Sequence, residues 1–160
     1  MPTGPDSFPA SGANSLASIA RRAVARAVDW ALLGLALAGV AFVLSLDPLN
    51  GEPVSPGARA VALALSWALM NVVYEGVLTT WRGRTLGKAA VGIRVARLVD
   101  GRSPLWWQSG MRVGVPVVVE VVPGLLGAFA VGVIYWAAAW DPMRRGLHDR
   151  AAGTVVVNVR

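Results

Sequence analysis

The stretch RRAVARAVDWALLGLALAGVAFVLSL, residues 21–46, decides the fold. Its second part, from Trp30 to Leu46, carries no charge, and about 17 mostly apolar residues are close to the minimum for a helix that spans a bilayer. Asp29 precedes this run, three residues after Arg26 and seven after Arg22, so a helix places all three on one face. We therefore predict a membrane helix in which Asp29 stays ionised because Arg22 or Arg26 partners it.

Composition extends this interpretation to the whole chain. Of its 160 residues, 55% are hydrophobic and 15% are charged, which is more apolar than a typical soluble domain. The apolar residues gather in three windows: Ala27–Leu46, Ala60–Trp81 and Val113–Trp140. Single acids, Glu75 and Glu120, interrupt the last two windows. We predict one integral membrane domain and exclude a soluble enzyme. The lack of cysteine and the single His148 exclude disulfides and multi-histidine metal sites, and no cofactor is expected.

The basic residues indicate how the chain is oriented. The net charge is +6, yet of 15 basic residues only Arg59 flanks the segment Asp47–Gly57. The others precede the first apolar window, lie in the range Arg82–Arg112, or follow Asp141. This distribution is typical of the positive-inside rule. We therefore expect both termini in the cytoplasm and a lipid bilayer, rather than nucleic acid, as the partner.

Local signals divide the chain into a tail and four helices. Residues 1–17 are rich in Pro, Ser and Gly and are predicted to be a disordered tail before a domain at 18–160. The expected helices are Ser18–Leu46, Ala58–Thr80, Pro104–Val122 and Leu125–Trp140. The last two, of about 16–19 residues or roughly 25–28 Å, form a hairpin at Pro123-Gly124 and are short for a full span. A re-entrant hairpin and one long tilted helix are the alternatives.

A cleaved leader is a competing interpretation of the first window. Arg21-Arg22 before an apolar run resembles a twin-arginine signal, and Ala36-Leu37-Ala38 resembles a cleavage site. The apolar run continues past Ala38, and the rest of the chain is itself membrane-like. We therefore favour a retained helix.

Two short segments have the composition of strands. Gly92–Val99 is rich in Val and Ile and is followed by Asp100-Gly101, a tight-turn signal. Val recurs through Thr154–Val159 at the end of the chain. We predict that these segments pair as a small cytoplasmic β element, because an isolated apolar strand leaves its backbone groups unpaired.

Three segments resemble the RDD family of small bacterial membrane proteins, named for one arginine and two aspartates. They are Arg22-x-x-Ala25-x-x-x-Asp29; Thr85-Leu86-Gly87-Lys88 with Gly92-Ile93-Arg94-Val95; and Gly146-Leu147-His148-Asp149-Arg150 with Ala152-Gly153-Thr154. The segments follow the family's order and spacing. The resemblance implies a multi-pass protein of the bacterial cell membrane and names Arg22, Asp29 and Asp149 as the family residues. It also implies transport, since cation–proton antiport has been proposed for some members.

Two carboxylates are candidate ion or proton sites. One is Asp29. The other is Glu75, which lies about six residues from the inner end of the second helix with Asn71 one turn before it. A carboxylate inside a membrane helix is by default a functional candidate. Glu120 is expected near the outer surface, where a charge costs little.

The remaining charged motifs have simpler interpretations. Thr85-Leu86-Gly87-Lys88 lacks the spacing of a phosphate loop, so the basic residues around it are expected to contact lipid headgroups: Arg82, Arg84 and Lys88. His148-Asp149 is either a proton relay or a pair in which Asp149 caps or binds locally to Arg145 or Arg150. We favour the local pair.

The resemblance to the RDD family implies transport of a cation coupled to proton movement, for which Asp29 and Glu75 are the candidate carboxylates. The alternative is a membrane scaffold, sensor or accessory subunit without transport activity. Gly34 and Gly39 favour close helix packing, so we also expect a homo-oligomer.

Overall fold

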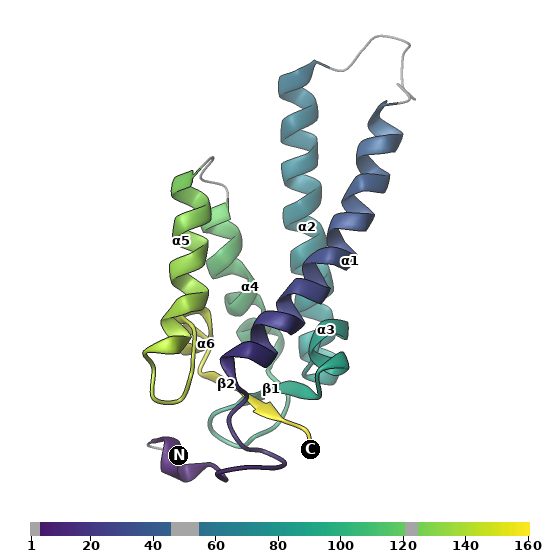
Figure 1. The fold of residues 1–160 in the computed structure, drawn as a ribbon. Coiled ribbons are helices and arrows are strands. Elements are labelled where there is room, and N and C mark those ends of the chain that lie inside the picture. Colours follow the sequence, from purple (N-terminus) through teal and green to yellow (C-terminus); the bar gives the residue numbers. More distant parts are fainter. Residues whose placement is uncertain (1–3, 46–54, 121–124) are drawn as a thin grey trace.

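A computed structural model describes residues 4–45, 55–120 and 125–160, most of which are helical. Two long helices, α1 (Ile19–Ser45) and α2 (Pro56–Arg82), stand beside a shorter pair, α4 (Trp106–Glu120) and α5 (Leu125–Trp136) (Figure 1). The short elements are η1 (Pro5–Ser7), α3 (Leu86–Ala90), β1 (Ile93–Arg97), η2 (Ala137–Ala139), α6 (Leu147–Ala151) and β2 (Thr154–Asn158). The strands, α3, α6 and both marked chain ends gather at one end of the molecule, named the sheet end.

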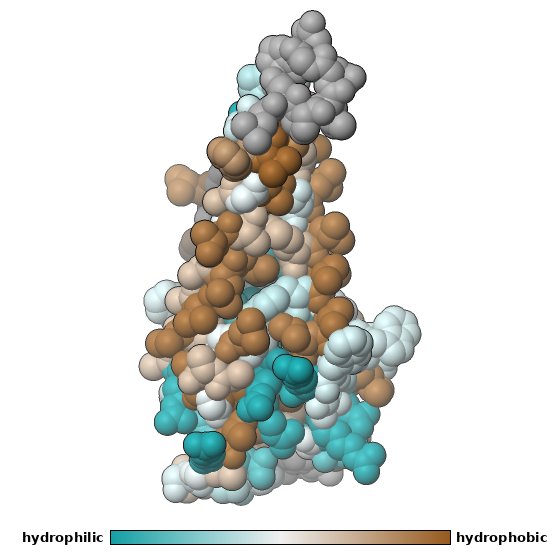
Figure 2. All heavy atoms as spheres, turned by 90° about the vertical axis from the view of Figure 1, so that its right-hand side faces the viewer, coloured by the Kyte–Doolittle hydropathy of each residue, from teal (hydrophilic) through white to brown (hydrophobic). Residues whose placement is uncertain are grey.

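Helices α1 and α2 have the length and the surface of membrane helices. Each contains 27 residues and is therefore about 40 Å long, more than the roughly 30 Å of a bilayer's hydrocarbon core. Large apolar side chains on both are exposed, including Leu35 at 75% and Leu65 at 65%. Figure 2 shows this apolar surface above a more hydrophilic base at the sheet end. Apolar exposure of this extent needs lipid or another helix to cover it. The prediction of two long apolar helices is confirmed.

Residues at both ends of α2 set its length. Ser55 precedes the helix and accepts a backbone N–H of the first turn at 3.3 Å. Gly83 ends it with a φ of +67°, and its N–H donates to the carbonyl of Thr79 at 3.0 Å. The Gly83 carbonyl then accepts the N–H of Val95 at 2.6 Å, which fixes β1 beneath the end of α2.

The third apolar window forms two helices. Helix α4 contains 15 residues and α5 contains 12, so they are about 22 Å and 18 Å long. They pack side by side (Figure 1), so the alternative of one long tilted helix is wrong. The predicted turn at Pro123-Gly124, most of the loop Asp47–Gly57 and the side chain of Glu120 lie outside the described residues.

The predicted strand pairing is confirmed. β1 and β2 are antiparallel, with Ile93 opposite Asn158 and Arg97 opposite Thr154. Both faces of the sheet are covered, because Ile93, Val95 and Val156 belong to one buried apolar cluster and Ala96, Val155 and Val157 belong to a second.

Residues 14–17, assigned to the tail from sequence, run along β2. Leu16 forms a bridge with Val157, and the N–H of Ala17 donates to the carbonyl of Val156 at 3.0 Å. Ala17 is fully buried. The contact anchors the start of α1 at the sheet end, an arrangement that the sequence pattern did not predict.

Candidate functional site

Asp29 is buried in the sheet-end half of α1, with 2% of its surface exposed. The Tyr74 hydroxyl of α2 and the Gly87 N–H of α3 donate to its Oδ1 at 2.7 Å and 2.8 Å. The Thr85 hydroxyl donates to its Oδ2 at 2.6 Å. Three short hydrogen bonds hold the carboxyl group in place, and no basic side chain of the described residues forms an ion pair with it.

The arginines predicted to partner Asp29 bind other carboxylates. Arg26 pairs with Glu75 on α2, and Arg22 pairs with Asp149 on α6. A shared helix face brings backbone positions close together, but an arginine side chain is long enough to reach a neighbouring element. The prediction of an ion pair for Asp29 within α1 is therefore wrong.

The motif Thr85-Leu86-Gly87-Lys88 forms the cradle around Asp29. The Thr85 hydroxyl caps α3 by accepting the N–H of Lys88 at 3.3 Å while it donates to Asp29. Gly87 lies so close to α1 that a Cβ there would be 2.1 Å from the carbonyl oxygen of Ala25. Only glycine permits this approach. The motif therefore docks α3 against α1.

Glu75, 5% exposed, joins four helices. Nη1 of Arg26 donates to its Oε2 at 2.8 Å, and Nζ of Lys88 donates to its Oε1 at 2.8 Å. The Arg26 guanidinium also lies over the ring of Tyr135 on α5, 4.6 Å from the centroid. Residues from α1, α2, α3 and α5 thus meet around one carboxylate.

Lys88 belongs to this network rather than to the surface. It is 6% exposed and paired with Glu75, so its predicted headgroup contact is wrong. Arg82 is exposed and Arg84 is half-buried, and for both the headgroup contact stays a prediction. Burial lowers the pKa of Lys88 from 10.5 to about 8; Glu75 raises this pKa and Arg26 lowers it. Lys88 can therefore lose its proton near physiological pH.

Asp149 lies between two arginines. Nη1 of Arg22 donates to its Oδ2 at 3.1 Å, and Arg112 of α4 donates to its Oδ1. Arg112 also donates to the Thr154 hydroxyl at 2.9 Å, and the Gly146 N–H donates to Oδ2 of Asp149 at 3.2 Å. The structure thus brings Arg22 and Asp149 together and leaves Asp29 in a separate cradle.

Of the local interactions predicted for Asp149, the helix cap is confirmed and the pair with Arg145 is not. Asp149 does cap its own helix through the Gly146 N–H. A pair with Arg145 is wrong, because Arg145 donates to Asp141 at 3.0 Å instead. Sequence reasoning missed Arg112. Its signal was a lone cation at the edge of the third apolar window, where a basic residue needs a partner.

His148 is neutral in this environment. It is 5% exposed, and its ring lies 4.8 Å from that of Tyr135, centroid to centroid. Burial and then the positive charge of Arg112 lower the pKa of His148 well below 6.5. The 3.6 Å approach of its Nε2 to Asp149 is therefore not an ion pair at neutral pH. The geometry gives no support to the proton-relay alternative.

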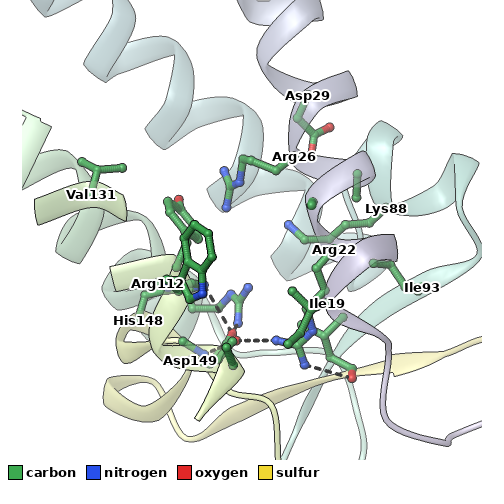
Figure 3. A pocket seen from close by; sticks show the side chains of 18 of the residues that line it. Ile19, Arg22, Arg26, Asp29, Lys88, Ile93, Arg112, Val131, His148 and Asp149 are labelled. Carbon is green, nitrogen blue, oxygen red and sulfur yellow. Dashed lines mark hydrogen bonds and ion pairs between the residues drawn. The ribbon is translucent and has the colours of Figure 1, made fainter. Parts of the chain in front are cut away.

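A pocket of about 460 Å³ lies between α1 and α5 beside these charges (Figure 3). Its charged lining residues are Arg22, Arg26, Asp29, Lys88, Arg112 and Asp149. Its apolar and aromatic walls include Ile19, Ala23, Trp30, Val131, Tyr135 and Trp136. Glu75 does not line the pocket but is paired with Arg26 and Lys88, which do. With Glu75 included, the site contains four basic side chains, Arg22, Arg26, Lys88 and Arg112, and three carboxylates, Asp29, Glu75 and Asp149. The site therefore carries one positive charge in excess while Lys88 is protonated.

Comparison with known protein families identifies the family of this chain. The RDD family model matches residues 16–153, a range that contains Arg22, Asp29 and Asp149. The chain has no match among curated proteins and none among solved structures.

Proposed function

The chain belongs to the RDD family, and we propose that it is a membrane transport protein in which a monovalent cation competes with the protonated side chain of Lys88 for Glu75. The observation that carries the proposal is the buried pair of Glu75 and Lys88, with Lys88 at the lining of the pocket. Of the two carboxylates that the sequence analysis named as candidates, Asp29 and Glu75, the proposed exchange site is Glu75.

Of the three carboxylates in the network, Glu75 has the partner that can give up its charge. Asp149 is held by two arginines, which stay protonated in proteins. Asp29 is held by neutral donors, whose charge does not change. Loss of the Lys88 proton leaves Arg26 as the one basic residue, among those described, in an ion pair with Glu75. A small cation at the same place supplies again the positive charge that Lys88 has lost.

The exchange conserves charge at the site. An incoming cation takes the place of the Lys88 Nζ at Oε1 of Glu75, and the ammonium becomes an amine by releasing one proton to water in the pocket. In the reverse step Lys88 takes up a proton and the cation leaves. Arg26 stays on Oε2 and keeps Glu75 ionised. With a pKa of about 8, the neutral amine of Lys88 costs about 1 kcal/mol at pH 7.

The sheet end is placed in the cytoplasm in this proposal. Basic residues gather there at the end of α2, along β1 and in the loop that follows: Arg82, Arg84, Arg94, Arg97 and Arg102. The positive-inside rule favours that side. Helices α1 and α2 then cross the membrane, and α4 and α5, each shorter than the hydrocarbon core, form a pair that enters it from the cytoplasmic side.

A second copy of the chain completes the pathway in this proposal. The pocket between α1 and α5 lies beside the charged start of α1, and a path across the membrane must extend beyond it. A Cβ at Gly34 or Gly39 of α1 would meet no atom within 4 Å, so these glycines serve no close packing within the described part of the chain. Small residues on an open helix face suit contact between membrane helices of two chains.

A scaffold, sensor or accessory subunit is the second candidate function. Asp29 and Asp149 are fully engaged by donors, as a structural ionic core requires. Across residues 4–45, 55–120 and 125–160, no three or more His, Cys, Asp or Glu side chains come together as metal ligands. In this candidate the network holds the helices together and transports nothing.

Proton-gradient measurements in vesicles separate the two candidates. The purified protein is reconstituted with an acidic interior, and collapse of the gradient is followed after addition of Na⁺, K⁺ or Li⁺. Lys88→Arg keeps the positive charge but cannot release its proton, so it should insert normally and lose the exchange. Arg84→Gln, outside the network, is the matched control and should keep it. Exchange at the wild-type rate in Lys88→Arg, or no response of the wild type to any of the three cations, would contradict the proposal.

A further inference from the structure

We infer that the pocket between α1 and α5 binds the phosphate of an anionic phospholipid, whose acyl chains leave the pocket between these two helices. The inference concerns the Asp149 side of the pocket and does not depend on cation exchange at Glu75. It rests on the charge of the site, on its apolar walls and on its level along α1.

The charge beside Asp149 favours an anion. Arg22 and Arg112 share this one carboxylate, so the group of three carries a positive charge in excess. Arg112 is 2% exposed, and neither its Nε nor that of Arg22 has a hydrogen-bond partner within the described part of the chain. A buried guanidinium without full compensation is costly. A phosphate offers both the charge and the acceptor oxygens that two guanidinium groups can share.

The net charge of the whole network is also positive. Asp29 and Glu75 are already engaged, so they cannot serve as the missing counter-charge for Arg22 and Arg112. Figure 3 shows the guanidinium groups of Arg26 and Arg112 reaching into the pocket from α1 and α4. A ligand placed between them therefore meets positive charge from both sides.

The walls of the pocket suit an amphiphile rather than a soluble phosphate. Ile19 and Val131 line it, so a small hydrated anion would leave apolar surface against water. Trp30 and Trp136 also line it and remain 41% and 68% exposed. Tryptophan prefers the interface between headgroups and hydrocarbon. The volume of about 460 Å³ is in the range of pockets for small ligands and can hold a headgroup with its glycerol.

The level of the pocket along α1 matches the headgroup layer. The charged start of α1, with Arg22 and Arg26, lines the pocket, and the uncharged run of this helix begins at Trp30. A phosphate bound at the arginines would thus lie at the depth where a phospholipid carries its own. Basic pockets between membrane helices on the cytoplasmic side are typical sites for anionic lipids.

Lipid titration of the purified protein tests the inference. Native mass spectrometry in detergent compares phosphatidylglycerol, phosphatidylcholine and inorganic phosphate as probes. Gly132→Phe fills the pocket from α5, where a Cβ meets no atom within 4 Å. Gly110→Phe on α4, also open but outside the pocket, is the matched control. We expect phosphatidylglycerol to bind about tenfold more tightly than phosphatidylcholine, and Gly132→Phe but not Gly110→Phe to lose that preference.

Three results would overturn the inference. They are equal binding of the two lipids by the wild type, an unchanged preference in Gly132→Phe, and displacement of the lipid by millimolar inorganic phosphate, which would indicate a site for a soluble anion. The wild-type comparison requires no variant and stands if Gly132→Phe does not fold. The lipid titration is made in detergent without added Na⁺, K⁺ or Li⁺, and the exchange assay measures a proton gradient in vesicles, so the failure of one proposal is distinguishable from the failure of the other.

Discussion

Replacing Gly87 with alanine should undo the docking of α3 on α1. The new Cβ would lie 2.1 Å from the Ala25 carbonyl oxygen, whereas ordinary contacts begin at 3.4 Å, so α3 must shift by about 1.3 Å. That shift breaks the hydrogen bonds of 2.8 Å and 2.6 Å that Gly87 and Thr85 donate to Asp29. Each hydrogen bond to a charged group contributes about 1.5–3 kcal/mol. Alanine regains roughly 1 kcal/mol through its helix propensity. We expect a net loss of about 2–5 kcal/mol in the free energy of unfolding.

Thermal unfolding in detergent, followed by tryptophan fluorescence, measures this loss. Gly76→Ala on α2 is the matched control, because a Cβ there meets no atom within 4 Å. We expect Gly87→Ala to unfold about 4–20 °C below the wild type, and Gly76→Ala to unfold at or above the wild-type temperature. Equal unfolding temperatures for the two variants would refute the docking of α3 through Gly87.

Three further predictions concern charge and orientation. Because the pKa of Lys88 is about 8 when folded and 10.5 when unfolded, the free energy of unfolding should rise by up to about 3 kcal/mol between these pH values, and Lys88→Gln should show no such rise in denaturant titrations. Arg112→Gln should lower the unfolding temperature more than Arg22→Gln, because the Arg112 side chain is 1% exposed and that of Arg22 is 14% exposed; equal losses would argue against this. Cysteines introduced at Ser11 and Arg102 should resist an impermeant thiol reagent in intact cells, and labelling at either would overturn the cytoplasmic orientation.

The long helices could be predicted because the bilayer constrains all their residues. The sequence pattern places the first helix at Ser18–Leu46, and the structure has it at Ile19–Ser45. A spanning helix must be apolar over its whole length, so its ends are visible wherever charge or proline returns. The strands were equally visible, because Val recurs in both and a tight-turn pair follows the first.

The partners of the buried charges could not be predicted from spacing. Helical spacing relates residues of one helix, whereas Arg26 crosses to Glu75 on α2 and Arg22 crosses to Asp149 on α6. The helices that position these groups, α3 and α6, have five residues each. Such helices are too short to show an apolar periodicity. The importance of Glu75 could be predicted, because it lies deep in an apolar window and a buried carboxylate needs a partner. The identity of that partner could not.

Chemical labelling of Lys88 tests the displacement of its ammonium from Glu75 most directly. Lys88 is the only lysine in the sequence, so acetic anhydride acetylates this side chain and the N-terminal amine. Mass spectrometry of the peptides gives both rates across a pH series, and the N-terminal amine is the internal control. The Lys88 rate should titrate near pH 8. Na⁺, K⁺ or Li⁺ should raise it below that pH, because the cation releases Lys88 as the reactive free amine. A Lys88 rate that none of the three cations changes would contradict the competition at Glu75.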